Sequence, residues 1–161
     1  MTEAAPEDGW EALLHPSGVL RFAGKAGRWY TGRGVIDCLR APLRGVDANL
    51  FGVLKAIVDT LGLVIVIASV DTGAHVKGSR HYQNRAVDLG LIGFTGRASD
   101  PVTPTSRPAL LLVEYLLLHG FRAGEGRTNP GPALLFGPPG GPTNPSKVDH
   151  SNHVHCSLGK K

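Results

Sequence analysis

Three side chains in this chain are of the types that hold a catalytic zinc ion: His81, Asp88 and His155. Two imidazole nitrogens and one carboxylate oxygen fill three tetrahedral positions and leave the fourth open for water. Zinc held in this way lowers the pKa of its water to about 7 and polarises a carbonyl group. The water must also lose a proton, and Asp149 and His153 are close enough in sequence to accept it. The pattern predicts metal-assisted hydrolysis.

The two segments that carry these residues alternate as strands do. Residues two apart in a strand share a face, so His153 and His155 are expected to point into one cavity. Ala86 and Asp88 are expected to share a face of another strand in the same way. An isolated His-x-His pair is more often a packing feature than a metal site. Here five of the seven histidines fall in these two segments and the turn that leads to them, which favours the metal site.

The chain divides into two parts of one compact domain. Residues 1–45 are rich in Gly and irregular, and we expect them to wrap around residues 46–161, the zinc-binding part. Apolar residues at helical spacing, between an N-cap at Asp47 and a stop at Gly62, predict a helix. The β-branched run Leu63–Ala68 that follows is too apolar for an edge, so it predicts a central strand.

The second half of the chain predicts one more helix and three strands. Ser106 is expected to cap a helix over Pro108–His119, which is apolar nearly all round and should be covered by the sheet. Residues 121–123 and 133–136 are expected to pair, and His153–Leu158 to form the last strand. The predicted fold class is α+β, with a central antiparallel sheet, helices packed on one side and a zinc cleft across the sheet.

Composition narrows the class of protein. No apolar run reaches about 18 residues and the N-terminus is acidic, so we expect neither a membrane span nor a secretory signal. Cys38 and Cys156 cannot make a disulfide framework and are expected to be free thiols. A net charge of +4 suits an anionic partner such as nucleic acid, anionic lipid or wall polymer. Scattered Lys and Arg and few aromatic residues make nucleic acid the least supported of these, and we expect a monomer.

At the candidate ligands the chain resembles a known family. The stretch His81-Tyr-Gln-Asn-Arg-Ala86-Val-Asp88 and the closing His153-Val-His155-Cys-Ser are similar to the zinc site of the LAS group of metallopeptidases. That group holds the D-alanyl-D-alanine carboxypeptidases, the L-alanyl-D-glutamate endopeptidases of phage lysins and the hedgehog signalling domain. The similarity to hedgehog is close at both motifs. In order of elements, the resemblance runs from Asp47 to Leu158.

The resemblance implies a role for each site residue. It makes His81, Asp88 and His155 the ligands of Zn²⁺. It makes His153 a non-ligand that stabilises the transition state or the water. In the peptidases an acidic base usually sits three residues before the last ligand, where this chain has Asn152, which cannot accept a proton. In hedgehog domains a Glu sits six residues before that ligand, where this chain has Asp149. The favoured base is therefore Asp149.

Other residues near the first ligand are candidates for contact with a substrate. His75 matches a further hedgehog site histidine, although a lone turn histidine has an equally good structural explanation. Ser79, Arg80 and Arg85 could bind a substrate carboxylate, while a solvated Arg is the commoner case. Asn84 replaces a Gly that is common in the family, and Asn tolerates a left-handed backbone best of the other residues.

The predicted function is that of a zinc metallopeptidase, a carboxypeptidase or an endopeptidase, which acts on D-amino-acid-containing stem peptides of bacterial peptidoglycan. The sequence pI of about 9.3 fits a phosphate-rich cell wall. The alternative is a hedgehog-like binding module that contains zinc and does not hydrolyse peptides. Asn152 favours the module and Asp149 favours the enzyme. Because no secretory signal is visible, we expect a phage lysin, a protein that is exported by another route, or a chain from which a leader was removed.

Overall fold

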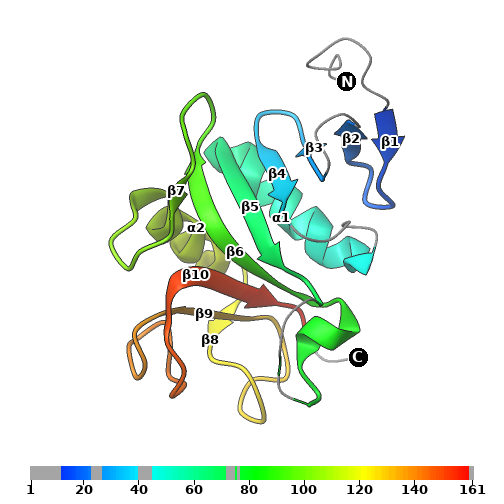
Figure 1. Ribbon diagram of the computed structural model, residues 1–161. Helices are drawn as coiled ribbons and strands as arrows, with labels where there is room; N and C mark the ends of the chain where they lie inside the picture. The colour runs from blue at the N-terminus through cyan, green and yellow to red at the C-terminus, as the bar shows by residue number, and fades with distance from the viewer. Residues whose placement is uncertain (1–11, 23–26, 40–44, 72–74, 76, 160–161) are drawn as a thin grey trace.

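A computed structural model describes residues 12–22, 27–39, 45–71, 75 and 77–159. The strands are β1 (Ala12–Leu14), β2 (Leu20–Phe22), β3 (Trp29–Tyr30), β4 (Val35–Cys38), β5 (Leu63–Ser69), β6 (Ala86–Phe94), β7 (Asp100–Pro101), β8 (Arg122–Ala123), β9 (Ala133–Gly137) and β10 (His150–Ser157). The helices are α1 (Ala48–Leu61), α2 (Arg107–Leu118) and the short 3₁₀ helix η2 (Arg80–Gln83). The described strands form one sheet in the order β1-β2-β3-β4-β5-β6-β10-β9-β8, with β7 beside β6. Helices α1 and α2 both lie behind it (Figure 1).

The sheet is mixed, so the α+β class and the helices on one side are confirmed but the purely antiparallel arrangement is wrong. Strand β4 pairs with β5 in parallel, because α1 carries the chain from the end of β4 back to the start of β5. Parallel neighbours need such a crossover, whereas a tight turn suffices for antiparallel ones. Strands β8 and β9, which were expected to pair, do so in parallel.

The described part of residues 1–45 contributes strands to this same sheet instead of only wrapping around it. Strand β4 lies beside the central strand β5, and Ile36 and Trp29 are buried in the core. These strands are only two to four residues long. Alternation cannot be recognised over so few residues, which is why the sequence pattern suggested irregular chain.

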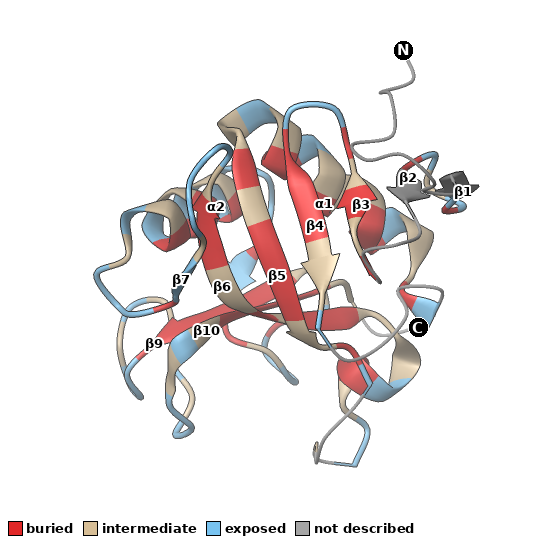
Figure 2. Ribbon diagram, turned by 45° about the horizontal axis from the view of Figure 1, so that its top comes forward, coloured by how far each residue is buried: buried red, intermediate tan, exposed pale blue. Residues whose placement is uncertain are grey.

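Helix α1 and strand β5 form the centre of the core as predicted. The Asp47 carboxylate accepts a hydrogen bond from the backbone N of Asn49 at 2.9 Å, and Gly62 ends the helix with a φ of 63°. Five side chains of α1 are buried, each of which stabilises the fold by about 1.5–3 kcal/mol. Buried residues lie along β5 and β6 and fill β9 (Figure 2). The buried α1 residues are Leu50, Phe51, Leu54, Ile57 and Val58.

Helix α2 is present but less covered than its composition predicted. Leu112 and Leu116 are fully buried, while Leu110, Leu117 and Leu118 are 45%, 42% and 75% exposed. Ser106 occupies the N-cap position, but its side chain makes no capping bond, because its Oγ accepts from the backbone N of Thr103. No helix among the described residues is long and apolar enough to cross a membrane.

The two cysteines are free thiols, as expected. Cys156 is completely buried in β10. Burial, with the nearby negative charges of Asp88 and Glu125, raises the pKa of this thiol far above its usual range. Cys156 is therefore a protonated part of the core and not a nucleophile.

A buried charge on α2 should abolish soluble folding. Leu112→Asp and Leu116→Asp would each place an unpaired carboxylate in the core, at a cost of several kcal/mol, close to the roughly 5–15 kcal/mol stability of a whole domain. Leu118→Asp is the matched control, since its side chain faces solvent. Soluble yield and thermal unfolding measure the effect. Normal folding of both core variants would contradict the packing of α2.

Candidate metal centre

The register of β6 and β10 brings the candidate ligands together. His155 stands directly opposite Asp88, and η2 delivers His81 beside them. Asp88 Oδ1 lies 3.0 Å from His155 Nδ1 and 3.3 Å from His81 Nε2, and the two nitrogens are 3.1 Å apart. Atoms bound to one tetrahedral zinc at its usual bond lengths lie about 3.3 Å from each other. The three atoms therefore fit three ligand positions of such an ion.

Both imidazoles are held with the correct nitrogen toward this triangle. His81 Nδ1 donates to the carbonyl of Val70 at 2.6 Å, which leaves Nε2 with its lone pair. His155 Nε2 donates to the carboxylate of Glu125 at 2.6 Å, which leaves Nδ1 to face Asp88. A metal-binding histidine usually donates its other nitrogen in this manner, because the bond sets the ring orientation and raises ligand basicity.

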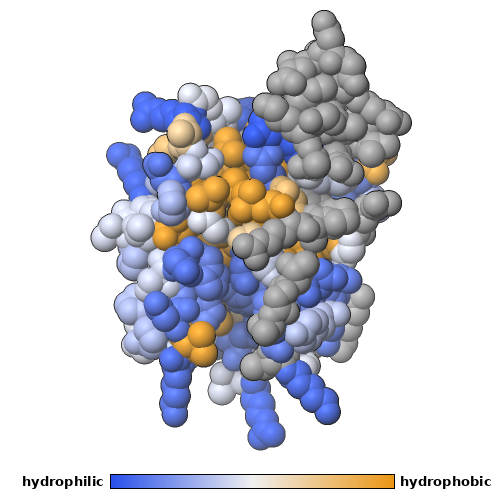
Figure 3. Space-filling view, viewed as in Figure 1, coloured by the Kyte–Doolittle hydropathy of each residue, from blue (hydrophilic) through white to orange (hydrophobic). Residues whose placement is uncertain are grey.

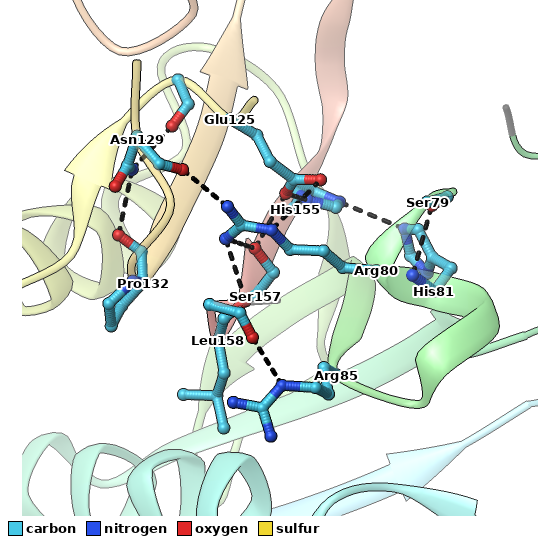
Figure 4. Close-up of polar contacts among 12 residues, drawn as sticks. Ser79, Arg80, His81, Arg85, Glu125, Asn129, Pro132, His155, Ser157 and Leu158 are labelled. Atoms are coloured by element: carbon cyan, nitrogen blue, oxygen red, sulfur yellow. Dashed lines mark hydrogen bonds and ion pairs between the residues drawn. The ribbon is translucent and has the colours of Figure 1, made fainter. Parts of the chain in front are cut away.

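Glu125 is a site residue that the sequence analysis missed. It follows β8, and its Oε2 also accepts from Ser157 Oγ at 2.8 Å (Figure 4). Burial would raise the pKa of Glu125, but the hydrogen bonds from His155 and Ser157 and the charge of Arg80 hold it at about 2. Glu125 is thus an ionised carboxylate that contacts His155 from behind the three ligand atoms of His81, Asp88 and His155, which we call the metal triangle. Glu125 stands between two glycines, 30 residues before His155, and no spacing rule links the two.

Arg80 has a structural role, and its predicted contact with a substrate carboxylate is wrong. Its side chain is fully buried. The guanidinium donates to the carbonyls of Gly131 at 2.6 Å, Asn129 at 2.6 Å and Leu158 at 2.9 Å, so it fastens the loop before β9 to the end of β10. Burial lowers its pKa. A side chain enclosed by backbone carbonyls cannot reach a ligand in solvent.

The neighbours of Arg80 set the shape of the η2 segment. Ser79 Oγ accepts from the backbone N of His81 at 3.2 Å and so caps η2. Asn84 ends η2 with a φ of 56°, which confirms the left-handed backbone expected at this position. Arg85 donates to Asp47 Oδ2 at 2.8 Å and to the Gly159 carbonyl at 2.6 Å. Arg85 therefore joins the start of α1 to the end of the chain.

A further histidine, His75, lies against His81. The ring of His75 stacks on that of His81 with 3.9 Å between centroids, and its Nε2 lies 3.3 Å from Ser69 Oγ. His75, His81 and Asp88 each offer a ligand atom within 4.8 Å of the others, so this group could hold a metal ion. His75 and His155 are therefore alternative candidates for a third ligand beside His81 and Asp88.

His153 faces the site as a neutral imidazole. Its Nε2 lies 3.8 Å from Asp88 Oδ1, and its Nδ1 donates to Asn152 Oδ1 at 2.7 Å. Burial lowers the pKa of His153, so the ring is uncharged at neutral pH and its Nε2 can accept a proton. The ring of His150, also missed by the sequence analysis, lies 4.9 Å from that of His153.

Asp149 lies immediately before β10 and is exposed. Its Oδ1 accepts from the backbone N of Ser151 at 3.1 Å and from its Oγ at 2.5 Å. Within the described ranges, no hydrogen bond or ion pair joins it to the three candidate ligands. Its role as the base stays a prediction, and His153 lies nearer to the triangle.

The charges of the triangle favour a bound cation. Burial would raise the pKa of Asp88, but the hydrogen bond from His155 and the close approach of His81 hold it far below its usual range. Burial would lower the pKa of His155, yet its hydrogen bonds to Asp88 and Glu125 raise it to about 9. Two carboxylates therefore flank one imidazole, and a divalent ion can replace the proton that lies between His155 and Asp88.

Comparisons by sequence and by structure find no relative. No protein-family model, curated protein or solved structure matches this chain. Membership of the LAS group therefore stays a prediction, and the function must be inferred from the site.

Loss of a ligand should remove the metal. We expect about one zinc per chain, and His81→Ala, Asp88→Ala and His155→Ala should each reduce it strongly. His75→Ala distinguishes the two candidate ligand sets, since it should spare the metal if His155 is the third ligand. His119→Ala, which lies outside the site, is the control. Metal analysis of the purified variants is the measurement, and unchanged zinc in all three ligand variants would contradict the assignment.

Loss of the charge behind the triangle should weaken metal binding without removing it. Glu125→Gln keeps the size of the side chain but takes away the anion that polarises His155, so zinc affinity should fall by about 10–100-fold. Glu114→Gln, exposed on α2, is the matched control. Competition with a chelator measures the affinity. Equal zinc affinity in Glu125→Gln and the wild type would show that Glu125 does not support the metal.

Proposed function

We propose that this protein is a zinc-dependent metallopeptidase that hydrolyses D-amino-acid-containing stem peptides of the bacterial cell wall. The observation that carries the proposal is the triangle of Asp88 Oδ1, His81 Nε2 and His155 Nδ1, with edges of 3.0–3.3 Å. Two imidazoles and a carboxylate are a donor set of catalytic zinc sites, which keep one position open. A structural zinc site would instead supply four protein ligands.

Zinc, when bound, supplies Lewis acidity that lowers the pKa of a water to about 7 and polarises a peptide carbonyl. The chain itself must move the proton. His153 suits this task, because Asn152 holds the proton on its Nδ1 and leaves Nε2 free toward the site. As a neutral base it can take a proton at Nε2 and return it to the leaving amine. Asn152, which cannot act as the base, would thus orient the residue that does.

The substrate class rests on the resemblance of the two motifs to the LAS peptidases. The net charge of +4 supports an anionic polymer as the surface on which the protein works. Because the metal triangle fits many peptide substrates, the choice between a carboxypeptidase and an endopeptidase depends on the groups around it.

A zinc-containing binding module is the second candidate. It is favoured by Asn152, which stands where the peptidases carry an acidic base and cannot accept a proton. Such a module would keep the metal triangle and bind a peptide without cleaving it.

Peptidase assays of the wild type and of variants distinguish the peptidase from the binding module. Zinc-loaded protein should release amino groups from purified peptidoglycan, and metal-stripped protein should not. General-base help is worth about 10²–10⁴ in rate, so the activity of His153→Ala should fall by about that factor while the variant keeps its zinc. Asp149→Asn should keep most of the activity, because its carboxylate is exposed and bound to Ser151. His119→Ala is the matched histidine control.

Each outcome has a separate meaning. A steep loss in Asp149→Asn with full activity in His153→Ala would make Asp149 the base. A wild type with confirmed zinc that releases nothing above the metal-stripped control would support the binding module.

A further inference from the structure

The face of the sheet that carries no helix holds a concave surface. A cavity of about 620 Å³ lies over β4, β5 and β6, within the size range of small-molecule pockets. Val64, Val66 and Leu91 line it, and Arg28 and Asp37 lie at the same cavity. Figure 3 shows apolar side chains gathered on this face. The metal triangle does not use any of these residues.

The cavity and the metal triangle lie on the same face of the sheet. The helix-side core contains Ile65 and Ile67 of β5, which alternate with Val64 and Val66. It also contains Val87, Val154 and Cys156, which alternate with Asp88 and His155. Because successive residues of a strand point to opposite faces, the cavity and the candidate ligands both point away from the helices.

The path between the two is short and lined by small residues. Leu91 pairs with Val66, and Asp88 pairs with Ser69, so three residues along each strand separate the cavity from the site, or about 10 Å. Ala68 and Gly90 lie in between. A Cβ on Gly90 would lie 3.2 Å from the Cβ of Ala68, so the two positions adjoin each other. Neither carries a side chain larger than a methyl group, so among the described residues these two positions add little height to the sheet.

We infer that the cavity is an extended subsite that binds an aliphatic side chain of the peptide substrate, about three residues from the bond that is cleaved. The inference rests on the proposed peptidase function. Three residues of extended peptide span about 10 Å, which matches the separation of cavity and site. The floor of Val64, Val66 and Leu91 favours an apolar side chain.

Three charged residues line the cavity: Arg28, Asp37 and Arg97. Arg28 and Asp37 bind each other through two hydrogen bonds, each of 2.7 Å. The carboxylate of Asp37 raises the pKa of Arg28 further above its usual range. Since this pair is satisfied internally, neither charge is free to bind an ion on the substrate.

Phosphinic peptides, in which a phosphinate replaces the scissile amide, test the subsite without turnover. The probes are an alanyl-phosphinyl-alanine core, and the same core extended by three residues that end in Leu or in Asp. Extensions are made at the amino or the carboxyl end. Calorimetric titration of zinc-loaded protein should show the Leu-ended peptide of one series binding about tenfold or more tighter than its Asp-ended partner.

Two further measurements locate this preference. In Ala68→Leu, a larger side chain obstructs the path, so the ratio of Leu to Asp affinities should fall toward one. Ala56→Leu, exposed on α1, is the matched control and should keep the ratio. In the wild type, the methyl resonances of Val66 and Leu91 should shift with the Leu-ended peptide and not with the core alone.

The outcomes distinguish this inference from the proposed function. Tight binding of the core with no preference for Leu in either series would overturn the subsite and leave the peptidase proposal standing. A preference for Leu in a protein that cleaves no wall peptide would support the subsite in a binding module. No binding of any probe by the zinc-loaded protein would overturn both. If the methyl resonances of Val66 and Leu91 shift with protein concentration and not with added peptide, the cavity is a contact between copies of the chain. That result would contradict the subsite.

Discussion

The pairing of His155 with Asp88 across β10 and β6 is the contact on which the site depends. A strand that slipped by one residue would turn its side chains to the opposite face, and a ligand would then enter the apolar core beside α1 and α2. The core residues Val87, Leu89, Val154 and Cys156 prevent this slip, because each is buried only in the observed register. The hydrophobic effect on one face of the sheet thus positions the polar chemistry on the other.

A second constraint is the charge that is buried behind the metal triangle. Glu125, Arg80 and His155 would each be costly to bury alone, but they share hydrogen bonds and opposite charges. Arg80 also satisfies three backbone carbonyls that would otherwise lack donors in the loop before β9 and at the end of β10. The metal site and the fold of the C-terminal segments are therefore supported by the same side chains. A change at Arg80 should disturb both together.

The two faces of the sheet differ: one is covered by the helices, and the other carries the candidate site residues. Helices α1 and α2 lie behind the sheet (Figure 1). The triangle and the apolar cavity lie on its other face. Strand β10 is irregularly paired with β9 between His150 and His155. This irregular stretch carries Asn152 and His153 and brings the imidazole of His153 toward Asp88.

The sequence by itself determined the features that depend on near neighbours. Asp47 and Gly62 bound a helix because caps act within one turn. Leu63–Ala68 is a central strand because a continuous apolar run rich in β-branched residues suits a strand that is paired on both sides. The assembly of His81, Asp88 and His155 was anticipated from residue type and from resemblance, and the structure brings their ligand atoms to about 3 Å from each other. Only the tertiary structure decided the rest. Glu125 meets His155 across 30 residues and Arg80 meets Leu158 across 78, and no local pattern encodes contacts at such separations. The parallel pairing of β4 with β5 and the orientation of His153 by Asn152 likewise follow from how the strands pack, because residues in short or irregular strands have no periodicity that predicts their partners.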